Sequence, residues 1–172
     1  NSAMLGYYFG SKDDLLRALI CSVTKSLGNW RLLMLRHLME EYQQESVPLE
    51  LLVQAYAAPF LTQDHPLARD INVHYRLLGR LFGEPNDSMS EFAQKQEFEP
   101  QQAYVQQFMR SAPHVPPEII VMRFGMMVGA LTVIGRRADM LKGLIPQGAS
   151  RLTEEDFLSL FARDWAAIFV MS

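Results

Sequence analysis

The chain has little cysteine and little net charge. Cys21 is its single cysteine among 172 residues, so a disulfide framework is excluded. It lies on an apolar helical pattern, which predicts a small buried hydrophobe, with a redox sensor as the alternative. A net charge of −3 argues against strong phosphate binding by these residues, so their own affinity for DNA is expected to be negligible.

The sequence also lacks the motifs that most often mark an enzyme. It contains no GxSxG, no HExxH, no cysteine pair and no phosphate-binding glycine loop, and its four histidines lack metal-ligand spacing. Neither a cofactor nor a metal site is therefore expected. A catalytic cluster assembled from distant residues is the alternative that motifs do not exclude. No uninterrupted apolar run approaches the length of a membrane span, which predicts a soluble protein.

No alternating strand pattern, repeat or low-complexity segment is present, and apolar residues recur at helical spacing almost everywhere. The sequence therefore predicts an all-α fold of about seven helices, with 49% hydrophobic residues to form one core. The first long helix is expected from Lys12 to Leu38. Its apolar stripe comprises Leu15, Leu16, Leu19, Ile20, Val23, Leu27, Trp30, Leu33 or Met34, and Leu38.

Proline and glycine divide the rest of the chain into further helices. Pro100 is expected to kink or restart the polar helix that contains it. The run from Lys142 to Thr153 is rich in turn residues and predicts a loop. The other helices are expected from Pro48 to Leu61, from the Asp64-His65-Pro66 cap to about Leu81, from Glu118 to about Asp139, and after a strong cap at Thr153.

The start of the chain combines a helix end with a helix start. Gly10 can adopt the left-handed conformation that ends a helix, and Ser11 with Asp14 has the spacing of a capping box. Two helices joined by so short a turn must cross, as in a helix-turn-helix unit.

The residues at this turn resemble a known family. Tyr7-Tyr8-Phe9-Gly10-Ser11-Lys12, followed by Leu15-Leu16, is similar to the conserved core of the TetR family of bacterial transcriptional regulators. The resemblance implies that residues 1–16 are the remnant of a helix-turn-helix DNA-binding domain whose first two helices are absent, and that residues 17–172 form a ligand-binding and dimerisation domain. It assigns Phe9 to the core of the DNA-binding domain. The DNA-binding residues it implies are Asn1, Ser2, Ala3, Gly6, Tyr7, Tyr8 and Lys12, although Gly6 departs from the Tyr or Asn of many members.

The last two helices are apolar around most of their circumference. A single chain could not cover both, so they are expected to form a four-helix interface in a two-fold homodimer, as the family's C-terminal helices do. The alternative is that they form the central core of a larger monomer. The expected interface residues are Phe124, Gly125, Val128, Gly129, Leu131, Phe161, Trp165, Ile168 and Phe169.

Ten methionines and several aromatic residues in the middle helices would suit an adaptable apolar pocket, although a packed core is the more common fate of such residues. A few polar residues lie among them and could orient a ligand. The candidate pocket residues are Trp30, His37, Tyr56, Phe60, His74, Tyr75, Phe108, Arg123 and Met127.

Together, the residues and the resemblance predict a cytoplasmic, homodimeric, ligand-responsive regulator of transcription. The expected partners are double-stranded operator DNA and a small apolar or amphipathic effector that releases a repressor from its operator. The alternatives are a ligand-binding protein of the same fold that does not regulate DNA, and a helical enzyme acting on an apolar substrate.

Overall fold

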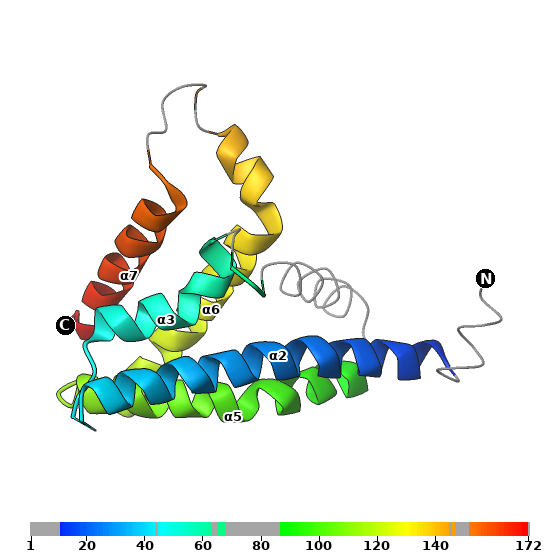
Figure 1. The fold of residues 1–172 in the computed structure, drawn as a ribbon, viewed down its shortest axis with the longest axis horizontal. Coiled ribbons are helices and arrows are strands. Elements are labelled where there is room, and N and C mark those ends of the chain that lie inside the picture. Colours follow the sequence, from blue (N-terminus) through cyan, green and yellow to red (C-terminus); the bar gives the residue numbers. More distant parts are fainter. Residues whose placement is uncertain are drawn as a thin grey trace.

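The fold is all-α, as the sequence predicts. The structure is a computed structural model, and it describes residues 11–43, 45–62, 65–67, 87–144, 146 and 152–171. These residues contain five helices and no strand (Figure 1). The helices are α2 (Lys12–Glu41), α3 (Leu49–Leu61), α5 (Asp87–Ser111), α6 (Pro117–Gly143) and α7 (Glu154–Val170).

Local capping sets the starts of α2 and α7. The Ser11 hydroxyl accepts the Asp14 backbone N–H at 3.1 Å, while the Asp14 carboxylate accepts the Ser11 backbone N–H at 3.1 Å. Thr153 and Asp156 repeat this reciprocal arrangement at α7. Each pair satisfies backbone donors that the first helical turn leaves unpaired, which confirms both predicted caps.

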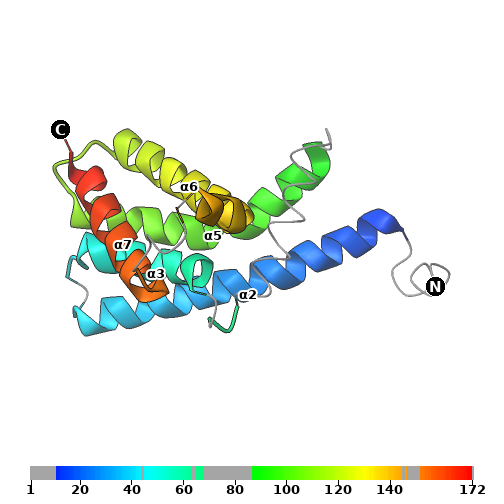
Figure 2. The same cartoon turned by 90° about the horizontal axis from the view of Figure 1, so that it is seen from above.

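α5 passes through Pro100 as one helix, so of the two predicted outcomes, a kink or a restart, the restart does not occur. Figure 2 shows α5 changing direction along its length, as a proline kink would do. Pro100 is buried, and its Cγ lies 3.0 Å from the position that a Cβ on Gly28 would occupy. The close approach of α2 and α5 at this point provides the tertiary packing that helps α5 tolerate the missing N–H of Pro100.

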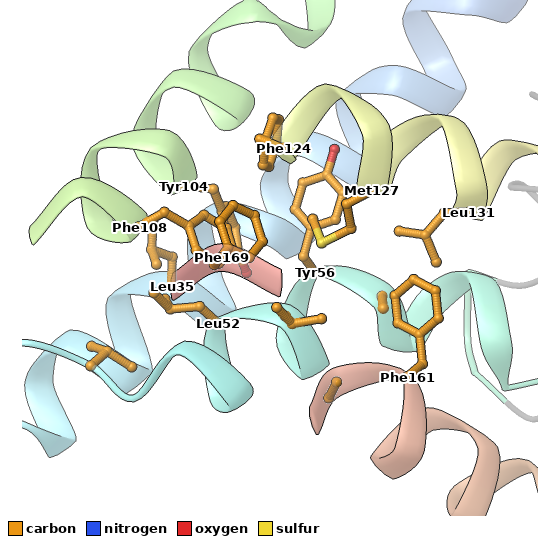
Figure 3. Close-up of a cluster of buried hydrophobic side chains, with 14 of the residues drawn as sticks. Leu35, Leu52, Tyr56, Tyr104, Phe108, Phe124, Met127, Leu131, Phe161 and Phe169 are labelled. Atoms are coloured by element: carbon orange, nitrogen blue, oxygen red, sulfur yellow. The ribbon is translucent and has the colours of Figure 1, made fainter. Parts of the chain in front are cut away.

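The core joins four helices through stacked and edge-on aromatic rings. Tyr56 of α3 meets Tyr104 of α5 and Phe124 of α6 edge-on, with centroids 5.1 and 5.2 Å apart. Phe169 of α7 stacks on Phe108 of α5 at 4.3 Å, and Figure 3 shows these rings gathered among the aliphatic side chains of the same cluster. Because these residues are separated by up to about two thirds of the chain, their packing fixes how the helices assemble.

Some helix boundaries agree with the prediction and others differ by a few residues. α3 begins at Leu49 after Pro48, close to the predicted start. α6 continues to Gly143, so the predicted start of the loop at Lys142 is two residues early. The predicted helix ending near Leu81 lies almost entirely outside the described residues, as do residues 1–10.

Candidate functional site

The predicted DNA-binding residues cannot be placed. Asn1, Ser2, Ala3, Gly6, Tyr7 and Tyr8 lie outside the described residues, as does the side chain of Lys12. The described chain starts at Ser11, where α2 is capped. In Figure 1 this end of α2 lies far from α7, so a single helix leads from the start of the described chain into the core.

The predicted pocket residues do not share one environment. Tyr56, Phe108 and Met127 are fully buried in the central cluster, whereas Trp30 and Phe60 are half-buried. His37 is exposed on α2, away from the apolar surroundings that the sequence pattern predicts for it. His74 and Tyr75 lie outside the described residues.

Arg123 binds the C-terminal end of α7. Its two terminal nitrogens donate to the backbone carbonyls of Phe169 at 3.0 Å and Met171 at 2.7 Å. The last carbonyls of a helix have no partner within the helix, and a cation there is also favoured by the helix dipole. Arg123 therefore has a structural partner in the chain itself, and we do not retain it as a ligand contact.

A cluster of buried polar groups lies around Arg31, a residue that is not among the candidates predicted from the sequence. The Arg31 side chain is 3% exposed, and its guanidinium lies over the Tyr56 ring, 4.0 Å from the centroid, and 5.3 Å from that of Phe60. Within the described part of the chain, Arg31 Nε and the hydroxyls of Tyr56 and Tyr104 have no hydrogen-bond partner; Gln107 Oε1 is also unpaired there, but its amide nitrogen donates to Met39 Sδ further along α2. Such groups are rare in folded proteins and each requires an explanation.

The environment of the two tyrosines keeps them protonated. Burial raises the pKa of Tyr56 to about 12, although the nearby Arg31 charge opposes this. Burial likewise raises the pKa of Tyr104, again against the influence of Arg31. Both hydroxyls are therefore available as hydrogen-bond donors at neutral pH.

Trp30 contacts a histidine rather than the central cluster. Its ring stacks on His65 with centroids 4.9 Å apart, and its indole N–H donates to His65 Nε2. Burial lowers the pKa of His65, and the Leu67 backbone N–H donates to His65 Nδ1 at 3.1 Å. A neutral imidazole has only one acceptor nitrogen, so His65 can accept a hydrogen bond from only one of these two donors in each tautomer.

α6 has two apolar faces that point in opposite directions. Ile120, Phe124, Met127 and Leu131 face the core and are almost completely buried. On the other side, Val121, Met122, Met126 and Val133 are 51 to 56% exposed. Gly125 and Gly129 lie in the same exposed stripe, and a Cβ at either would meet no heavy atom within 4 Å. We call Val121, Met122, Gly125, Met126, Gly129 and Val133 the outer face of α6.

The predicted dimer residues divide between the core and the surface. Phe124, Leu131, Phe161 and Phe169 belong to the chain's own core, so they are not directly available to a partner. Gly125 and Gly129 are exposed, and Val128, Trp165 and Ile168 are half-buried. The predicted interface mixes residues of the inner and outer faces of α6, because the sequence pattern does not separate the two faces.

Among the described residues, the segment Pro117–Ile134 of α6 is long and apolar enough to cross a membrane, and 22% of it is buried within the chain. Its inner face packs against α3 and α5 through Ile120, Phe124 and Met127, so lipid could not surround it without dismantling the core. Within the described residues, no three His, Cys, Asp or Glu side chains gather closely enough to hold a metal ion.

The family model for the tetracyclin repressor-like C-terminal domain matches residues 54–161, more than half of the chain. The chain belongs to the TetR family. A search of curated proteins found no match. The matched TetR-like region runs from within α3 to the first half of α7, and so contains the core rings of Tyr56, Tyr104, Phe108 and Phe124 and the outer face of α6, but not Phe169.

Arg31 lies on α2, before the region that the TetR-family model matches. A signal for it was nonetheless present in the sequence. It lies four residues after Leu27 and four before Leu35, so helical spacing places it on the same face as these two buried leucines. Arg31 is thus a charged residue within a buried stripe, whereas the predicted candidate His37 on the same helix is exposed.

Proposed function

We propose that this chain is the regulatory part of a homodimeric, ligand-responsive transcription factor, acting as a repressor that a small apolar or amphipathic molecule releases from its operator. The single observation that carries the proposal is the family match over residues 54–161. Two features of the molecule support it: an exposed apolar face on α6 and a buried polar cluster on α2, α3 and α5.

A second copy of the chain is the occupant we propose for the outer face of α6. Its residues, with the two glycines included, recur at three- and four-residue intervals, and Gly125 and Gly129 would allow two helix backbones to approach closely. An exposed apolar stripe of this kind usually marks an interaction site. α7 and the residue that follows it add exposed apolar surface through Phe157 and Met171, which are 40 and 60% exposed.

α2 is the element we propose to transmit ligand binding to the DNA-binding residues. It is one continuous helix from Lys12 to Glu41, and it carries Arg31 about two thirds of the way along. A tilt of this helix would move the residues before Ser11, which by resemblance contact DNA. In a two-fold dimer this changes the separation of the two recognition helices, which must match half-sites about one DNA turn apart or a multiple of that.

The dimer is tested with two charge substitutions at sites of equal exposure. Met126 on the outer face of α6 and Leu33 on α2 are both 56% exposed. Met126→Glu places two like charges in an apolar interface and should convert a dimer to a monomer in light scattering at micromolar concentration. Leu33→Glu should leave the mass at twice that of one chain. A wild-type monomer, or equal behaviour of the two variants, would contradict the proposed interface.

DNA binding is tested with the protein expressed from its complete gene. Selection from a random pool of double-stranded DNA should enrich a two-fold related sequence whose half-sites are separated by about one helical turn or a multiple of it. Recovery of no common sequence, with the dimer intact, would favour the alternative of a ligand-binding protein that does not regulate DNA.

A further inference from the structure

The strongest unexplained feature of the molecule is the buried Arg31 guanidinium. Its contacts within the described residues are the faces of two aromatic rings, Tyr56 and Phe60, and its Nε has no hydrogen-bond acceptor there. Aromatic faces attract a cation but do not accept its N–H groups in the way that a carboxylate does. Within the described residues Arg31 makes no direct ion pair, although the Glu97 carboxylate lies close enough to Tyr56 to help raise its pKa, so no carboxylate in contact with this buried cation compensates there for its lost hydration.

Two further donors lie in the same part of the core. The Tyr56 and Tyr104 rings meet edge-on at 5.1 Å, and the hydroxyls of both are buried without a partner in the described chain. Arg31 is close enough to influence the ionisation of both. One guanidinium and two neutral O–H donors together match a ligand that carries one negative charge and several acceptor lone pairs.

We propose that Arg31, Tyr56 and Tyr104 bind the acid group of the effector, and that the effector is a small amphipathic carboxylic acid. A carboxylate can accept two parallel N–H bonds from a guanidinium, and its remaining lone pairs can accept the tyrosine hydroxyls. A phosphate dianion would bring more charge than one guanidinium neutralises in a buried site. This inference rests on the proposed function, because it names the ligand class of the same regulator.

The apolar part of the ligand would lie beside Phe60 and Leu27. Phe60 packs against Leu27 and also lies 5.3 Å from the Arg31 guanidinium, so it links the polar cluster to an apolar patch between α2 and α3. A ligand with a charged end and an apolar body would bridge these two environments.

Binding of this acid requires the helices to move apart. Tyr56 and Tyr104 have no exposed surface, and Arg31 is 3% exposed. A carboxylate therefore reaches them only in a conformation in which α2, α3 and α5 have separated, and it stabilises that conformation by pairing with Arg31. A ligand that binds one conformation more tightly shifts the population toward it, which here moves α2.

The test compares acids with their uncharged amides. Octanoate and phenylacetate are titrated against octanamide and phenylacetamide, with affinity measured by calorimetry and by the shift in the thermal midpoint. We expect at least one acid to bind the wild type about tenfold or more tightly than its amide, as a charge-assisted bond in a buried site would give. Arg31→Met should abolish this preference, and Tyr104→Phe, which keeps the charge, should reduce it.

Arg36→Met is the matched control, because Arg36 lies on the same helix but is exposed. It should keep the full preference for the acid. A purely structural role for Arg31 gives a different pattern: Arg31→Met would lower the thermal midpoint of the unliganded protein, and the wild type would show no preference between acid and amide.

Absence of acid preference in the wild type, or its persistence in Arg31→Met, overturns the inference. Neither result affects the dimer or the selection of DNA, which are measured without ligand. Failure of this inference is therefore distinguishable from failure of the proposed function.

Discussion

Truncation of Phe169 is expected to destabilise the protein severely, although this residue lies three positions from the end of the chain. Phe169 has no exposed surface, and its ring stacks on Phe108 with centroids 4.3 Å apart and planes inclined by 11°. Phe→Ala substitutions at such sites cost about 3 to 5 kcal/mol, through lost transfer free energy and the cavity that remains. Since whole domains are stable by only about 5 to 15 kcal/mol, this loss is a large part of the total.

The measurement is urea unfolding of Phe169→Ala at a fixed chain concentration, with Val170→Ala as the control. Val170 is adjacent but 39% exposed, so its truncation should cost no more than about 1 kcal/mol. The dependence of the unfolding free energy on urea should not change, since the same surface is exposed on unfolding.

A loss below about 1 kcal/mol for Phe169→Ala would refute the reasoning. It would mean that the last turn of α7 frays, as chain ends often do, and does not belong to the core. Phe169 is not on the outer face of α6, so the folded fraction of the variant should still form the proposed dimer.

Two other predictions concern the side-chain cap at the start of α7 and His65, the residue that contacts Trp30. Thr153→Ala removes the side-chain cap of α7 and should lower the unfolding free energy by about 1 kcal/mol, whereas Ser159→Ala in the middle of the same helix should change it by less than about 0.5 kcal/mol. Hydrogen bonds from the Thr153 N–H and hydroxyl lower the pKa of Asp156. The Asp156 carboxylate therefore stabilises the folded chain above the ordinary pKa of 3.8, and this stabilisation is lost as the pH falls through the lower pKa of the folded state. A Thr153→Ala protein whose stability in acid is unchanged would contradict this. Burial lowers the pKa of His65 from 6.5, so the unfolded chain binds the proton more readily and the thermal midpoint should fall as the pH is lowered from 7.5 to 5.5. His65→Phe should weaken that pH dependence, while His114→Gln, which alters an exposed residue, should leave it unchanged.

The structural features predicted best from the sequence are those formed by residues that lie close together along the chain. The Ser11 and Thr153 caps each involve residues three positions apart, so the sequence contains all the atoms that form them. The all-α class follows in the same way from helical spacing of apolar residues. α2 was predicted from Lys12 to Leu38 and extends to Glu41, within the usual uncertainty of helix ends.

The candidate site was predicted much less completely, because burial depends on packing between distant segments. Arg31 is surrounded by rings from α3 that lie about 25 residues further along the chain, and no local pattern reveals them. Of the two alternatives that the sequence left for the apolar stripe of α2, Met34 is half-buried whereas Leu33 is 56% exposed. Pro100 would restart an isolated helix, whereas packing of its ring against Gly28 allows α5 to continue.

The sequence by itself therefore determined the helices, their caps and the family resemblance, because these depend on spacing along one chain. Only the tertiary structure decided which face of each apolar helix is covered. α6 is apolar on both sides, and periodicity does not distinguish the face that packs against α3 and α5 from the face that is left exposed. The same packing left the charge of Arg31 inside the core and left the outer face of α6 exposed, and these are the two features from which the effector and the partner are inferred.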